Sequence, residues 1–206
     1  MKNFGEIMFT DAVQVEQSRR GSRDGYAKMT ARPAPTGLSD REAAFIAERD
    51  SFYMASVTQT GWPYVQHRGG PKGFLKIINA TTLGMADYRG NKQYVSTGNF
   101  KIDNRVSLFL MDYPNRARLK LLARVNVEDV VDNPKLAEQF FSEGQGRVEQ
   151  LMTFTVEAFD WNCPQFITPR FTENQVRDVM KPKLDELDRL EVENAALKDR
   201  LAALGA

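Results

Sequence analysis

The sequence predicts a mainly β fold, a small β-barrel with flanking helices, followed by a C-terminal coiled-coil helix. Two observations predict the barrel: roughly six or seven short runs alternate as strands do, and turn residues separate them at short intervals. A third observation, a leucine repeat with a period of seven, sets the tail apart. The 206 residues suffice for one sizeable domain and an appendage. We expect an N-terminal arm over 1–37, a barrel domain over 38–170 and a helix over 171–206.

The arm is predicted to wrap the domain or its partner. Residues 10–15 have the pattern of a short helix, but the glycine- and proline-rich segments 21–25 and 32–37 break any long element. A clearer helix is predicted over 39–49, because Ser39 and Glu42 have the spacing of a capping box.

Strand patterns dominate the middle of the chain. Segments 59–62 and 79–82 are predicted hairpin turns, and 112–115 joins two longer strands. A helix is predicted over 133–141, where Pro134 suits the first turn. The predicted strands are 52–57, 63–66, 74–78, 83–86, 105–111, 118–127 and 151–159.

The tail has a heptad pattern with one asparagine at a core position, which favours a parallel two-stranded coiled coil. Lys183 at d interrupts the first heptad, and Pro182 marks the expected helix start. The alternative is an amphipathic helix packed on its own domain. The predicted core positions are Met180, Leu187, Asn194 and Leu201 at a, and Leu190, Leu197 and Leu204 at d.

Composition excludes several classes of function. The 28 Lys+Arg and 27 Asp+Glu create no basic field for nucleic acid or a membrane surface. No apolar run approaches the roughly 18 residues of a transmembrane helix, and the start lacks a signal-peptide pattern. The single cysteine, Cys163, excludes an internal disulfide, so we expect a cytoplasmic protein. The single histidine, His67, leaves no histidine-rich metal site and disfavours hydrolase triads, whereas redox chemistry on a bound cofactor remains open.

Residues 64–100 concentrate glycines, arginines, amides and hydroxyls around short apolar runs. Glycine permits close backbone approach to a ligand, arginine binds anions, and amide and hydroxyl side chains supply neutral hydrogen bonds. This segment therefore predicts a site for a nucleotide-like ligand on a β scaffold.

Four motifs follow one another along the chain: HRGGPxGFL (67–75), DYRGNxQYxSTGN (87–99), RVSLFLMDYP (105–114) and WNCPQ (161–165). In this order they resemble the pyridoxamine 5′-phosphate oxidase-like FMN-binding split-barrel proteins, in the branch whose substrates are poorly defined. The resemblance covers roughly residues 5–170. It implies a split barrel and a homodimer with FMN at the subunit interface.

The resemblance also implies which residues contact the flavin. The first group, at the ring edge or phosphate and along the next strand, is His67, Arg68, Gly69, Gly70, Phe74 and Leu75. The second, in the phosphate-binding segment, is Asp87, Tyr88, Arg89, Gly90, Asn91, Gln93, Tyr94 and Ser96. The third is Arg118 and Lys120 near the ring, with Trp161 approaching from the partner subunit.

Alternatives stand beside several of these assignments. Val95 and Ser96 stand where the oxidases have an adjacent Arg-Lys pair, and the positive charge of the phosphate-binding segment has moved upstream to Arg89 and Lys92. Arg118 and Lys120 share one face of a strand, which is either near the ring or an exposed barrel face. His67 is either a polarising group or a structural histidine, and Cys163 is more typical of a small buried residue than of a nucleophile.

The resemblance implies an FMN-dependent oxidoreductase that passes a hydride between a small donor, such as a reduced nicotinamide, and a small-molecule acceptor. No residue is assigned a catalytic role, and no metal is expected. No histidine follows Trp161, so the substrate-phosphate pair of true pyridoxamine phosphate oxidases is missing. The alternatives are a non-catalytic flavin carrier or sensor, and a haem protein in which His67 is the ligand.

Overall fold

The computed structural model describes residues 1–142, 146–161 and 164–205. The chain divides into two units. The first comprises Met1–Asp112 with Arg116–Phe166, and the second comprises Tyr113–Asn115 with Ile167–Ala206.

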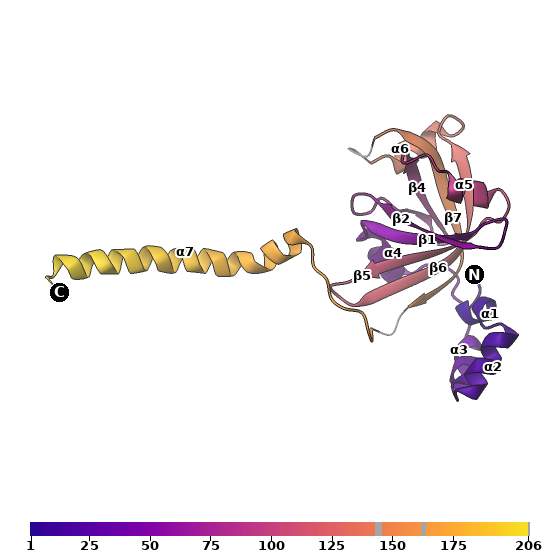
Figure 1. The fold of residues 1–206 in the computed structure, drawn as a ribbon, viewed down its shortest axis with the longest axis horizontal. Coiled ribbons are helices and arrows are strands. Elements are labelled where there is room, and N and C mark those ends of the chain that lie inside the picture. The colour runs from indigo at the N-terminus through magenta and orange to yellow at the C-terminus, as the bar shows by residue number, and fades with distance from the viewer. Residues whose placement is uncertain (143–145, 162–163, 206) are drawn as a thin grey trace. The chain divides into compact units, whose positions relative to one another are not determined.

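The described part of the first unit contains one seven-stranded antiparallel sheet in the order β2-β1-β5-β6-β7-β4-β3 (Figure 1). This confirms the predicted mainly β, split-barrel-like fold with flanking helices and a long C-terminal helix. The strands are β1 Ser51–Val57, β2 Pro63–Gly69, β3 Lys76–Asn79, β4 Thr82–Tyr88, β5 Arg105–Asp112, β6 Ala117–Asp129 and β7 Val148–Trp161.

The core lies on the inner face of this curved sheet because the strands alternate. In β1 and β5 every second residue is buried, including Phe52, Met54, Leu108 and Leu110. The predicted strand at 74–78 starts later than expected. Phe74 and Leu75 precede β3 and are buried in the core, where the ring of Phe74 stacks on that of Phe52.

The N-terminal arm is more helical than predicted, with α1 Phe4–Met8, α2 Asp11–Arg19 and α3 Arg23–Thr30. Gly21 adopts a left-handed φ of 75° between α2 and α3, which is the break that the glycines of 21–25 predicted. The backbone N–H of Lys2 donates to the carbonyl of Glu157 in β7 at 2.8 Å. This contact joins the start of the arm to the sheet.

Two other helices were predicted and one was not. Helix α4 (Asp40–Ala47) has the expected capping box of Ser39 and Glu42, although it ends two residues early. Helix α6 (Pro134–Phe140) is capped by the Asn133 side chain, which accepts from the N–H of Leu136 at 3.2 Å. Helix α5 (Val95–Phe100) carries no strong helical signal, because threonine and glycine disfavour helix.

The second unit contains α7 (Glu173–Ala203), and its predicted start at Pro182 is wrong. The helix begins at Glu173, where Thr172 and Gln175 form a capping box that satisfies the first backbone N–H groups. Pro182 lies inside the helix, where it removes one backbone hydrogen bond. None of the described helices is both long and apolar enough to cross a membrane.

Candidate functional site

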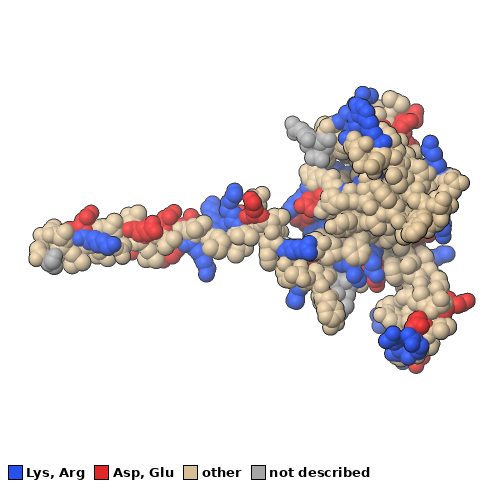
Figure 2. Space-filling view, in the orientation of Figure 1, with Lys and Arg blue, Asp and Glu red and all other residues tan. Residues whose placement is uncertain are grey.

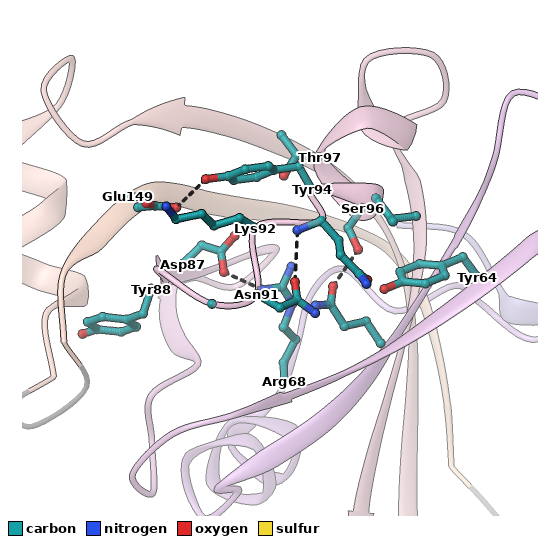
Figure 3. Close-up of a pocket in the computed structure, with 14 residues that line it drawn as sticks. Tyr64, Arg68, Asp87, Tyr88, Asn91, Lys92, Tyr94, Ser96, Thr97 and Glu149 are labelled. Carbon is teal, nitrogen blue, oxygen red and sulfur yellow. Dashed lines mark hydrogen bonds and ion pairs between the residues drawn. The ribbon is translucent and has the colours of Figure 1, made fainter.

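A pocket of about 140 Å³ lies where β2, at one end of the sheet order, meets β4, near the other end (Figure 3). The loop after β4 and the start of α5 form its rim. Its lining residues are Tyr64, Gln66, Arg68, Asp87, Tyr88, Gly90, Asn91, Lys92, Gln93, Tyr94, Val95, Ser96, Thr97 and Glu149. We call it the β2–β4 pocket.

Strand alternation sets which side chains of β2 reach this pocket. Tyr64, Gln66 and Arg68 are two residues apart, so they share the inner face of the sheet. His67 therefore points to the opposite face, where it is exposed and its ring lies 5.6 Å from that of Tyr53 in an edge-on contact. His67 does not line the pocket.

An ion pair between Arg68 of β2 and Asp87 of β4 bridges the two strands. Both side chains are nearly buried, with 12% and 17% of their surface exposed. Burial raises the pKa of Asp87 above its ordinary value, against the opposing effect of Arg68, and the negative charge of Glu149 adds to the rise. The Nε atom of Arg68 is buried and has no hydrogen-bond partner among the described residues.

The loop after β4 is held in an uncommon backbone conformation. Lys92 and Tyr94 have left-handed φ values of 60° and 50° without being glycine, which costs of order 1–3 kcal/mol each. The Asn91 side chain accepts from the N–H of Gln93 at 3.1 Å. Ser96, at the start of α5, donates to Gln66 of β2 at 2.8 Å. These contacts hold amide, hydroxyl and ammonium groups at the pocket rim.

Glu149 of β7 is an acidic lining residue that contacts the loop after β4. The hydroxyl of Tyr94 donates to Glu149 at 3.1 Å, and the guanidinium of Arg89 lies 3.5 Å from the same carboxylate. The hydrogen bond to Glu149 raises the pKa of Tyr94. Glu149 is a pocket residue that the sequence motifs did not indicate.

The pocket brings together eight of the residues predicted to contact a flavin, from two separate motifs. These are Arg68, Asp87, Tyr88, Gly90, Asn91, Gln93, Tyr94 and Ser96. Five lining residues besides Glu149 are not among the predicted flavin contacts: Tyr64, Gln66, Lys92, Val95 and Thr97. Because residues of a strand alternate between its two faces, the inward position of Arg68 also predicts that Tyr64 and Gln66 face the pocket.

The other residues of the first motif lie outside the pocket lining. Phe74 and Leu75 are core residues, and Gly70 makes room for one of them. A Cβ at Gly70 would come within 2.7 Å of the Phe74 ring, so this glycine has a packing role in the chain whatever its role toward a ligand. Gly69 lies at the end of β2, where a Cβ would meet the His67 ring at 3.1 Å.

The third predicted group also lies outside the pocket lining. The ammonium of Lys120 is 2.7 Å from Asp160 and 4.5 Å from the centre of the Phe4 ring. The guanidinium of Arg118 lies 5.2 Å from the centre of the Phe109 ring.

Trp161 connects β7 to α4. Its indole N–H donates to Glu42 at 2.6 Å, and its ring makes an edge-on contact with Phe45. Within one chain this tryptophan has a structural role. Its approach to a flavin in the partner subunit stays a prediction, and Cys163 of the same motif lies outside the described residues.

The β2–β4 pocket fits part of a flavin. Its hydroxyl and amide groups suit the polar edge of a flat ring, and the buried Arg68 Nε is an unsatisfied donor. Asp87 and Glu149 balance the charges of Arg68 and Lys92, so the lining is less positive than a dianionic phosphate prefers. The volume is below the roughly 300–1,000 Å³ of ordinary ligand pockets.

No protein-family model matches the chain, and no curated protein sequence matches it. Similar solved structures include a candidate pyridoxamine 5′-phosphate oxidase from Lactobacillus delbrueckii, with 16% identity, a TM-score of 0.48, and coverage of 61% of this chain and 95% of that one. A protein related to general stress protein 26, of the pyridoxinephosphate oxidase family, from Clostridium acetobutylicum has 12% identity, a TM-score of 0.43, and coverage of 59% and 85%. HupZ of Group A Streptococcus has 11% identity, a TM-score of 0.47, and coverage of 65% and 99%. Members of the oxidase-like family that the four motifs resemble are thus among the similar structures, and no function follows from these low identities.

Proposed function

We propose that this chain binds FMN at the β2–β4 pocket and acts as an oxidoreductase on a small molecule. One observation carries the proposal. Arg68, from the first motif, lies against the segment from Asp87 to Ser96, from the second, in one polar pocket. Two motifs that resemble flavin-contacting segments on sequence alone therefore converge in space.

We further propose that a second copy of the chain completes the site. The pocket of one chain is too small for a whole FMN, as its volume of about 140 Å³ indicates. Large apolar side chains are also exposed on and beside β2: Val65 is 60% exposed and Trp62, in the preceding turn, is 73% exposed. Such residues are typical of a surface that a partner covers.

When bound, FMN supplies a ring that takes up and releases electrons and a proton, and the protein binds and orients it. Arg68 and Lys92 would supply the positive donors, and Ser96 and Asn91 the neutral hydrogen-bonding groups. Tyr64 would provide a flat wall on the β2 side. Burial around Arg68 keeps water from its guanidinium, which strengthens each contact that it makes.

The first test is the visible absorption spectrum of the purified protein, before and after heat release of any ligand. Two flavin bands, with released material that behaves as FMN, would support the proposal. A colourless protein that also fails to quench the fluorescence of added FMN would overturn it.

A matched pair of variants localises the site. Lys92→Gln removes one charge-assisted donor from the pocket, which should raise the Kd for FMN by about 10- to 100-fold, since such a bond contributes about 1.5–3 kcal/mol. Lys101→Gln removes the same charge from an exposed position outside the lining and should leave the Kd unchanged. Equal effects of the two substitutions would place the flavin elsewhere.

The oxidoreductase activity needs its own test. Anaerobic addition of a reduced nicotinamide to the FMN-loaded protein should bleach the flavin bands, and an electron acceptor should restore them over many cycles. If the oxidised spectrum persists with every donor tried, the chain binds flavin without turnover, as a carrier or sensor does.

A further inference from the structure

Within its own unit, no described element covers the apolar face of α7. All described residues of the helix are exposed, and five of its core-position side chains, Met180, Leu187, Leu190, Leu197 and Leu201, are 43–55% exposed. Helices of a globular protein draw most of their stability from packing of such a face. A helix of 31 residues with a continuous leucine face therefore indicates a partner.

We propose that this partner is the α7 of a second copy of the chain, packed in parallel and in register as a two-stranded coiled coil. This inference is independent of the flavin site. Asn194 occupies an a position, where two such side chains facing each other specify a parallel dimer. Glu193 at g then faces Lys198 at e of the partner helix, an attractive pair that occurs twice in the dimer.

The other charged pair across the interface, Glu186 at g with Glu191 at e, is unfavourable in this register. Arg189 on the same helix reduces the repulsion, because it lies 2.8 Å from Glu186 and 3.7 Å from Glu193. Figure 2 shows both positive and negative side chains on the visible face of α7.

The apolar seam extends past Lys183 toward the start of the helix. Val179 at g and Leu184 at e are both apolar, and they face each other across a parallel dimer on either side of Lys183 at d. The methylene stem of Lys183 can lie along this seam with its ammonium in water. Pro182 occupies a c position, which points away from the partner, so its ring does not obstruct the seam.

An antiparallel pair would lose these features. When the two helices overlap over their full length, Asn194 would face Lys183 of the partner helix, so the layer of two facing asparagines would be lost. The two barrel domains would also be attached at opposite ends of a helix about 46 Å long. The parallel arrangement attaches both at the same end.

Disulfide trapping in the full chain tests the proposal. In a Cys163→Ser background, Leu197→Cys places a thiol at a core d position, where two in-register helices bring the Cα atoms within disulfide reach. Mild oxidation should convert most of this variant to a disulfide-linked dimer on a non-reducing gel. The control is Val192→Cys at the outward f position, which is 72% exposed and should give little dimer.

Two outcomes would overturn the proposal. One is a Leu197→Cys dimer yield no greater than that of Val192→Cys. The other is efficient trapping of Met180→Cys with Leu197→Cys in a mixture of the two variants: a full-overlap antiparallel pair brings these positions together, whereas a parallel pair holds them about 25 Å apart. Circular dichroism of each variant checks that α7 is still helical. Flavin content, measured on the same samples, is a separate readout, so failure of the flavin proposal would leave this result interpretable.

Discussion

Replacement of Arg68 by methionine tests how β2 and β4 are held together. The substitution keeps much of the side-chain volume but leaves Asp87 as a carboxylate with only 17% of its side chain exposed and no cation beside it. Breaking a buried ion pair in this way costs about 3–5 kcal/mol. In a chain of this length, that loss corresponds to a Tm decrease of about 6–20 °C.

The loss in free energy of unfolding should depend on pH, and the direction of this dependence follows from the ionisation of Asp87. Burial already raises the pKa of Asp87, and removal of Arg68 takes away the charge that opposes this rise. A carboxyl with a raised pKa holds its proton more strongly in the folded than in the unfolded state, so its unfavourable effect develops as pH rises through the unfolded and then the folded pKa. The free energy of unfolding of Arg68→Met should therefore be well below that of wild type at pH 7, and this difference should shrink as the pH falls toward 4.

Urea unfolding, followed by tryptophan fluorescence at pH 7 and at lower pH, measures both effects. Arg105→Met is the matched control, because Arg105 pairs with Asp103 at 2.5 Å but is 70% exposed, and such surface pairs contribute about 1 kcal/mol or less. The double variant Arg68→Met with Asp87→Asn should recover part of the loss, since it leaves no unpaired charge. A deficit below about 1 kcal/mol for Arg68→Met, unchanged with pH, would refute the reasoning.

Three further predictions concern other parts of the chain. Glu42→Gln should lower the free energy of unfolding by about 1–3 kcal/mol in urea titrations at pH 7, because its carboxylate accepts from Ser39 and Trp161. Burial raises the pKa of Glu42, but these hydrogen bonds bring it below its ordinary value overall. The stability that the hydrogen bonds contribute is therefore present above the pKa of the unfolded state and is lost at lower pH. The difference in free energy of unfolding between Glu42→Gln and wild type should fade as the pH drops below 4. Gly84→Ala should cost about 1–3 kcal/mol by thermal melting, since its Cβ would overlap the ring of Phe140. Pro182→Ala should raise the helical circular dichroism signal of α7 and stabilise the helix by up to about 3 kcal/mol, and an unchanged or weaker signal would contradict its placement inside the helix.

The sheet could be predicted because its strands carry their own signal. Runs such as 105–111 alternate between buried and exposed positions, and this period of two is a property of the local sequence. The long helix was predicted from its leucine repeat, but its start was not. Pro182 on its own suggests a helix boundary, whereas the capping box of Thr172 and Gln175 starts the helix at Glu173, nine residues before Pro182.

The sequence predicted only part of the pocket, because some lining residues are close together in the sequence and others are brought together by strand pairing. Residues of the loop after β4 are close in sequence, so a cluster of polar side chains there is visible as a motif. Glu149 comes from β7, more than fifty residues from Tyr94, and only the pairing of β4 with β7 brings the two together. Helix α5 escaped prediction because its position depends on tertiary contacts, such as the buried hydrogen bond from Asn99 to Ser56, more than on helix propensity.

Residues that line the β2–β4 pocket also hold β2 against β4 and α5, so they affect both ligand binding and the stability of the fold. In the described sheet, β2 is an edge strand that pairs with β1, and side-chain contacts connect it to β4 and α5: the ion pair of Arg68 with Asp87 and the hydrogen bond of Ser96 with Gln66. A ligand that accepts a hydrogen bond from the buried Nε of Arg68 would satisfy a donor for which the described residues supply no partner. Because such a ligand binds the folded state alone, it should raise the free energy of unfolding by about 2.7 kcal/mol at a concentration of 100 Kd. Variants of the pocket should therefore lose stability and ligand affinity together, and the two losses can be separated by measuring unfolding with and without FMN.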